Sequence, residues 1–160
     1  MICLGISIGT TRTGVCVIKD GTLRERRVHT YPHTFTDNKA RIITNKYRHY
    51  IDKYRVTDIA VKIPAQAKQT KAVKLLLHRI KKLAEECGCE FDLTNMFEMK
   101  SLTDTYTSEE TIRYITEKYP ELKLIYDKDR ERDFKHSKKI FEAVLVAYLH
   151  RERSLKRQVQ

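Results

Sequence analysis

The first eighteen residues restrict the fold more than any other part of the chain. Residues 2–8 are almost continuously apolar and lack the polar alternation of a half-solvated strand, so they predict a central strand buried on both faces. After a glycine-containing turn, residues 14–18 form a second apolar segment that runs back. The Asp-Gly pair at positions 20 and 21 then predicts another hairpin and a third strand over residues 23–31. The chain therefore opens with an antiparallel meander.

The next part of the chain alternates between helical and strand patterns. Apolar residues spaced three and four apart predict amphipathic helices over residues 39–54 and 66–87. We expect the three tyrosines on the first of these helices to pack against the sheet. The mostly apolar segment 57–64 predicts a strand that lies parallel to the first one after a right-handed crossover. Polar and apolar residues alternate over residues 90–96, which predicts an edge strand with one solvated face.

The C-terminal part of the chain is less regular. A capping-box sequence that begins at Thr107 predicts a short helix ending before Pro120, and the charged segment 121–135 favours a solvated loop. A broadly apolar pattern over residues 137–153 predicts a well-packed closing helix. Residues 154–160 are basic and predict a frayed tail.

Length and composition indicate one domain over residues 1–153, followed by the basic tail 154–160. The chain has 160 residues, of which 41% are hydrophobic, and this is enough for a substantial core. The four cysteines lack the paired spacing of a zinc site, and we interpret them as reduced thiols. No apolar run of membrane-spanning length and no signal peptide is present, so we expect a cytoplasmic protein without membrane contacts.

The charge of the chain predicts its partners. Thirty-two Lys and Arg residues against 21 Asp and Glu residues give a net charge of +11 and a pI of about 9.5. Polyanions, and nucleic acids in particular, are the natural partners of such a surface. The alternative is a lysine-rich surface that is merely solvated. Salt-dependent binding distinguishes the two, because neutralised phosphates release counterions.

The opening hairpin with its Gly9-Thr10-Thr11 turn, together with the order of the later elements, resembles the ribonuclease H-like superfamily, particularly RuvC-type Holliday junction resolvases. The same hairpin opens the sugar-kinase and heat-shock ATPase group, but those proteins need two such domains, so the length favours the resolvase-like reading. The resemblance implies an α/β fold: a ribonuclease H-like mixed five-stranded sheet, with an antiparallel three-strand meander followed by parallel strands, flanked by helices.

The resemblance also implies three metal-binding carboxylates, and they would fall at Ser7, Lys62 and Glu142. Only Glu142 is an acid. A serine hydroxyl is a poor ligand for a hard divalent cation, and an ammonium group repels one. We therefore interpret the site as degenerate, with no metal and no cofactor. We further expect Lys62 to occupy the cation position and pair with Glu142, with Ser7 hydrogen-bonded between them; the alternative is that Lys62 points into solvent.

These features favour a catalytically inactive nucleic-acid-binding protein that contacts structured DNA or RNA, with a homodimer expected from the resemblance. One alternative is a divergent metal-dependent endonuclease or Holliday junction resolvase, using Mg²⁺ or Mn²⁺, in which Glu98 or Asp104 joins Glu142. Another is a nucleotide-phosphate-binding module at residues 9–12. The expected phosphate-contacting residues are Thr10, Thr11, Arg12, Lys62, Lys68, Lys71 and Lys74.

Overall fold

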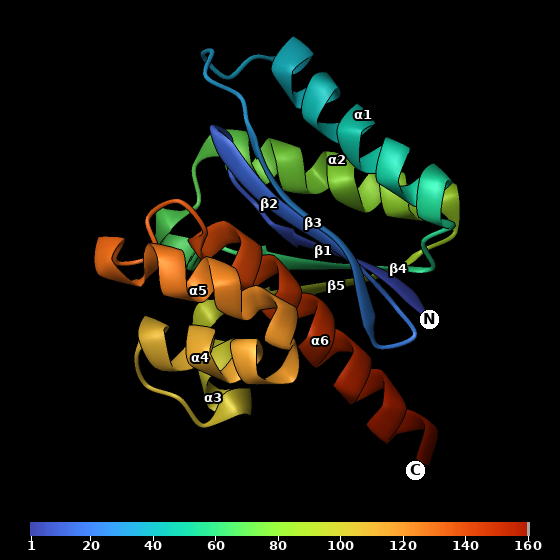
Figure 1. Cartoon of the computed structure of the whole chain (residues 1–160). Helices are drawn as coiled ribbons and strands as arrows, with labels where there is room; N and C mark the ends of the chain where they lie inside the picture. Colours follow the sequence, from blue (N-terminus) through green and yellow to red (C-terminus); the bar gives the residue numbers. More distant parts are fainter. Residues whose placement is uncertain (160) are drawn as a thin grey trace.

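The computed structural model describes residues 1–159, which form a mixed five-stranded sheet with helices on both faces (Figure 1). The strands are β1 (Ile2–Ser7), β2 (Arg12–Lys19), β3 (Thr22–Thr30), β4 (Asp58–Ile63) and β5 (Glu90–Asn95). Their order in the sheet is β3-β2-β1-β4-β5. The first three strands are antiparallel, and β4 and β5 run parallel to β1. The predicted fold class, with a meander followed by parallel strands, is confirmed.

Helices α1 (Asp37–Tyr54) and α2 (Lys71–Cys87) cover one face of the sheet (Figure 1). Each helix begins at a threonine whose hydroxyl accepts a backbone N–H, as expected for helix N-caps. Tyr47 and Tyr50 are buried in the core that these helices form with alternate residues of β1, β2 and β4. The predicted packing of the α1 tyrosines against the sheet is therefore confirmed for these two.

The opposite face is covered by the long helix α6 (Lys138–Val159) and by a group of shorter helices that pack beside it (Figure 1). The shorter helices are α3 (Met96–Thr103), α4 (Ser108–Lys118) and α5 (Lys123–Asp129). No helix within residues 1–159 is both long enough and apolar enough to cross a membrane.

Two glycines allow α6 to lie unusually close to the sheet. A Cβ atom on Gly5 of β1 would lie 2.2 Å from the carbonyl oxygen of Ala143, and one on Gly14 of β2 would lie 2.1 Å from that of Lys139. Real Cβ atoms do not approach oxygen so closely, so any side chain here would push the helix away. The small-residue composition of the first hairpin thus sets the distance between α6 and the sheet.

Two predictions for the C-terminal third are wrong. Residues 121–135 do not form a solvated loop, because Leu122 and Phe134 are buried beneath α5 and its flanking turns. The carboxylate of Asp129 accepts hydrogen bonds from the backbone N–H and the hydroxyl of Ser137, so it organises the start of α6. The basic tail is also helical: α6 continues through Val159, while Gln160 lies outside the described residues.

A buried ionic cluster holds the middle of α6 to β4 and β5. His150 contacts Asp58 through Nε2 at 2.7 Å and Asp92 through Nδ1 at 3.1 Å. Arg153 adds a 2.7 Å contact to Asp92. The hydrogen bond to Asp92, aided by Asp58, raises the pKa of His150 above its ordinary value of 6.5. Burial opposes ionisation of Asp92, but the bond from His150 and the charge of Arg153 outweigh it and lower the pKa of Asp92.

This cluster predicts a pH dependence of stability. Because the folded pKa of His150 is raised, its stabilisation is complete below 6.5 and is lost as the pH rises through the folded pKa. The lowered pKa of Asp92 has the opposite consequence: its stabilisation is present above 3.8 and is lost as the pH falls through the folded value. We expect the free energy of unfolding, measured by urea denaturation, to fall more steeply in the wild type than in His150→Gln as the pH rises above 6.5.

Other titrating groups, such as the buried Lys139, are common to both proteins and cancel in the comparison. Parallel profiles for the wild type and His150→Gln would contradict the assignment.

Candidate functional site

The site is built where β1 and β4 end side by side. Side chains alternate between the two faces of a strand, and on these strands Ser7 and Lys62 both lie on the face that α6 covers. They are also direct partners in the parallel register of β1 and β4. The hydrophobic pattern that sets this register therefore brings a hydroxyl and an ammonium group together under the first turns of α6.

Glu142 completes the site from α6. Its Oε2 atom lies 2.9 Å from Nζ of Lys62, and its Oε1 atom accepts a 3.1 Å hydrogen bond from the hydroxyl of Ser7. The side chains of Lys62 and Glu142 are only 15% and 5% exposed, so the ion pair is largely shielded from water. The predicted pairing of Lys62 with Glu142, with Ser7 joining it, is confirmed. Lys62 does not point into solvent.

A second lysine at the site was missed by the sequence reasoning. Nζ of Lys139 donates a 2.7 Å hydrogen bond to the carbonyl of Ile8, directly after β1. Burial lowers the pKa of Lys139 to about 8, although the charge of Glu142 acts in the opposite direction. The signal was present in the sequence, because residues three apart on a helix share a face and Lys139 precedes Glu142 by three.

The residues at this position do not fit a divalent metal centre. Hard cations bind several oxygen ligands, preferably charged ones. Here the one carboxylate is paired with Lys62, and Lys139 lies close enough to interact with the charges of both Glu142 and Lys62. Within residues 1–159, no group of three or more His, Cys, Asp or Glu side chains is arranged to hold a metal ion. Glu98 and Asp104 thus do not combine with Glu142 into such a group.

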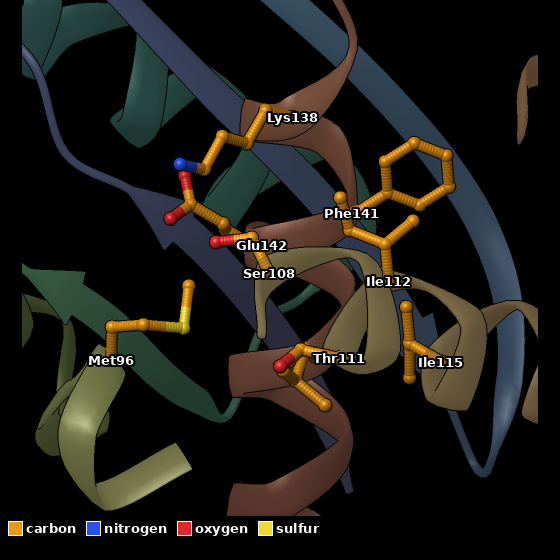
Figure 2. A pocket seen from close by; sticks show the side chains of 9 residues that line it. Met96, Ser108, Thr111, Ile112, Ile115, Lys138, Phe141 and Glu142 are labelled. Carbon is orange, nitrogen blue, oxygen red and sulfur yellow. The ribbon is translucent and has the colours of Figure 1, made fainter. Parts of the chain in front are cut away.

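A small cavity lies on the other side of Glu142, between α6 and the helices α3 and α4 (Figure 2). Its volume is about 10 Å³, which is room for roughly one water molecule. Met96, Ile112 and Phe141 form much of its wall, while Glu142 and Lys138 contribute polar groups (Figure 2). The helices α3 and α4 therefore close this flank of the site and leave no space for a substrate there.

The other predicted phosphate contacts surround the same end of the sheet. Thr10 and Thr11 lie in the turn that follows β1, and Thr11 is exposed. Arg12 is half-buried and donates a 3.1 Å hydrogen bond to the carbonyl of Lys135. Three exposed lysines lie in the turn after β4 and in the first turns of α2, namely Lys68, Lys71 and Lys74. Only Lys62 among the predicted contacts belongs to the ion pair with Glu142.

Comparison with known proteins identifies the fold. No protein-family model matches the chain, and no curated protein sequence matches it. Two solved structures of RuvC from Thermus thermophilus, one of them in complex with a Holliday junction substrate, are similar to it with a TM-score of 0.75. In each case the match covers 98% of this chain and 96% of the RuvC chain at 16% sequence identity. The chain therefore has a RuvC-like fold of the ribonuclease H-like type.

The buried ion pair predicts strongly coupled mutational effects. Lys62→Met leaves the Glu142 carboxylate buried without its partner, so we expect a loss of about 3 kcal/mol in the free energy of unfolding. Lys62→Met combined with Glu142→Leu should recover most of that loss, because an apolar pair carries no desolvation cost. Urea denaturation of the four proteins of the double-mutant cycle measures both effects. A cost for Lys62→Met below about 1 kcal/mol, as for an exposed pair, would contradict the geometry.

Proposed function

We propose that this RuvC-like protein binds nucleic acid at the basic end of its sheet and does not cleave it. The observation that carries the proposal is the ion pair between Lys62 and Glu142, at 2.9 Å, where the resemblance to resolvases implies metal-binding carboxylates. Phosphodiester cleavage by metal ions needs a metal-activated water and stabilisation of the leaving oxygen. An ammonium group that neutralises the only carboxylate supplies neither. Because the carboxylate is already neutralised, the other cations at this end of the sheet remain free to attract phosphate.

The start of helix α2 supports phosphate binding at this end. Helices usually carry acidic residues in the first turn, because the exposed N–H groups make that end positive. The first turn of α2 has no acid and instead contains Lys71 and Lys74. The start of α6 also carries two lysines, Lys138 and Lys139, but there the carboxylate of Asp129 already accepts backbone N–H groups, so of these two helices only α2 lacks an acidic partner. Lys71 and Lys74 oppose the dipole of α2 and reduce its stability. A bound phosphate would reverse that cost, since it interacts favourably with both the lysines and the helix end.

The two faces of the sheet differ in charge, so a nucleic acid is attracted to one of them. Helices α1 and α2 each contain five Lys and Arg residues against two Asp and Glu residues. Residues 96–159, which cover the opposite face, contain 14 basic residues against 12 acidic ones. The positive charge is therefore concentrated on the α1/α2 side and at the end of the sheet where Lys62 lies. Such asymmetry steers a polyanion to one side of a protein.

Branched nucleic acid is the substrate class to test first. One of the similar RuvC structures contains a Holliday junction substrate. Because phosphate contacts give affinity without sequence choice, we propose recognition of shape and charge in structured DNA or RNA.

Binding of a four-way DNA junction should depend steeply on salt and on the lysines of α2. In Lys71→Glu/Lys74→Glu we expect at least about tenfold weaker binding and a salt slope flatter by roughly 1 to 2, because each phosphate contact contributes about 0.9 to the slope. Fluorescence anisotropy over a range of salt concentrations measures both quantities. Lys123→Glu/Lys128→Glu on α5 is the matched control, since it makes the same charge change at two exposed lysines of the opposite face.

The junction should stay intact during incubation with Mg²⁺ or Mn²⁺. Cleavage that Glu142→Gln abolishes would overturn the proposal, as would equal loss of binding in the two double variants.

Restoring the carboxylates should restore a metal site. In Ser7→Asp/Lys62→Glu three acids converge where the wild type has one, so we expect Mn²⁺ to stabilise this variant and not the wild type. A metal at about a hundred times its dissociation constant adds roughly 2.7 kcal/mol, which raises the Tm by several degrees. Thermal unfolding with and without Mn²⁺ measures the shift. An equal shift in the wild type would show that the ion pair does not exclude metal.

A further inference from the structure

Two adjoining pockets lie beside the end of β3, outside the site around Glu142. One has a volume of about 440 Å³ and the other of about 590 Å³, and both are lined by Thr30, Tyr31 and Ile42. Each volume lies within the range of roughly 300–1,000 Å³ that is typical of small-molecule sites. Because they share these three lining residues, the pockets form one groove with two compartments, lined by the loop that follows β3 and by α1. Figure 1 shows how this loop leads into α1.

The loop that forms the groove is anchored at three points. The backbone N–H of Tyr31 donates a 2.6 Å hydrogen bond to the carbonyl of Thr11. At the other end of the loop, the hydroxyl of Thr36 caps α1 by accepting from the N–H of Lys39 at 3.1 Å. Between them, the ammonium group of Lys39 donates to the carbonyl of His33. The groove is thus largely formed before any ligand binds, which reduces the entropy lost on binding.

The environment of Lys39 indicates that the ligand is negatively charged. The residue is 7% exposed and lines the larger compartment. Its ammonium group is bonded to a backbone carbonyl, and among residues 1–159 no carboxylate lies within ion-pair distance of it. A buried cation without a counter-charge is costly. A phosphate group in the larger compartment would supply that counter-charge.

Rings and amides line the smaller compartment and its boundary with the larger one. Tyr31, His29 and His49 line it with aromatic rings, the type of side chain on which bases stack, and the amide of Asn45 can both donate and accept hydrogen bonds. Burial and the nearby charge of Lys46 lower the pKa of His29, so its ring is uncharged at neutral pH and suited to stacking. Lys46 itself is exposed and adds a second cation for phosphate.

The groove adjoins the turn that follows β1. Thr30 on its wall pairs with Arg12 in the β2–β3 register, and Thr11 holds the first residue of the loop. The groove therefore begins beside the turn that follows β1, although the side chain of Arg12 lies on the α6 face of the sheet.

We infer that the groove binds a single-stranded segment of nucleic acid, with about one nucleotide in each compartment, a phosphate at Lys39 and bases against Tyr31 and the histidines. This inference rests on the proposed function and adds a second mode of binding to it. A duplex buries the faces of its bases in the stack, whereas unpaired nucleotides expose them to aromatic side chains. An acidic peptide would satisfy Lys39 but would make no use of the rings.

The test measures binding of fluorescein-labelled single-stranded 12-mers, oligo-dT and oligo-rU, by fluorescence anisotropy. Ile42→Glu places a negative charge in both compartments at a helix position that is already 48% exposed, so the fold should be retained. We expect this variant to bind at least about tenfold more weakly than the wild type, equivalent to 1.4 kcal/mol. Leu124→Glu on α5, which makes the same substitution in charge at a 66% exposed apolar residue, should bind within about twofold of the wild type.

Lys39→Met separates a ligand contact from a structural role. It keeps the buried stem but removes both the charge and the bond to the carbonyl of His33. Loss of the bond destabilises and loss of the buried charge stabilises, so we expect a Tm close to that of the wild type together with about tenfold weaker oligonucleotide binding. A lower Tm with unchanged binding would overturn the inference. Equal effects of Ile42→Glu and Leu124→Glu would also overturn it, as would displacement of the 12-mer by a poly-glutamate peptide at matched charge concentration.

The two proposals fail in different ways. If the four-way junction binds and the single-stranded 12-mers do not, the groove assignment is wrong and the proposed function stands. If neither binds, both are wrong. If Ile42→Glu weakens the binding of oligo-dT alone or of oligo-rU alone, the groove assignment is supported. The affected 12-mer then identifies the sugar that the groove accepts.

Discussion

The seam between α6 and the sheet is the contact on which the rest of the structure depends. Gly5 and Gly14 let the helix backbone approach β1 and β2 directly, and ionic contacts then hold it to β4 at two points. Lys62 binds Glu142, and four residues earlier on the same strand Asp58 binds His150, eight residues later on the helix. The two spacings match, because four strand residues cover about 13 Å and eight helix residues about 12 Å. The seam therefore fixes helix position and site geometry together.

At the end of that seam a single carboxylate is paired with an ammonium group, whereas a metal centre groups several carboxylates around one cation. The carboxylate of Glu142 is neutralised by Lys62, and Lys139 adds a second cation nearby. The interaction is strong because it is shielded from water, yet it gains little stability over an apolar pair, since both charges had to be desolvated. The ion pair disfavours binding of a divalent ion at this position. It also leaves the end of the sheet positively charged.

The proposed binding surfaces follow from the same geometry. The C-terminal ends of β1, β3 and β4 lie at the same end of the sheet. Helices α1, α2 and α6 begin near that end. This topology gathers residues that are far apart in the chain, among them Arg12, Lys39, Lys71 and Lys139. A RuvC-like fold alone does not imply an activity, because function lies in the residues placed on the scaffold. Here those residues are cations and rings instead of paired acids.

The sequence by itself determined the order of the sheet, its two main helices and the pairing of Lys62 with Glu142. Apolar runs define the buried strands and alternation assigns side chains to faces, which are local rules. The pairing of Lys62 with Glu142 was not local: the resemblance to resolvases placed both positions at one site, and their opposite charges then predicted the contact. Only the tertiary structure decided the helical course of residues 121–135, the ionic cluster at His150 and the groove at Tyr31. Each depends on contacts between residues distant in the chain, such as Asp58 with His150, 92 positions apart, and local periodicity carries no information about such distances.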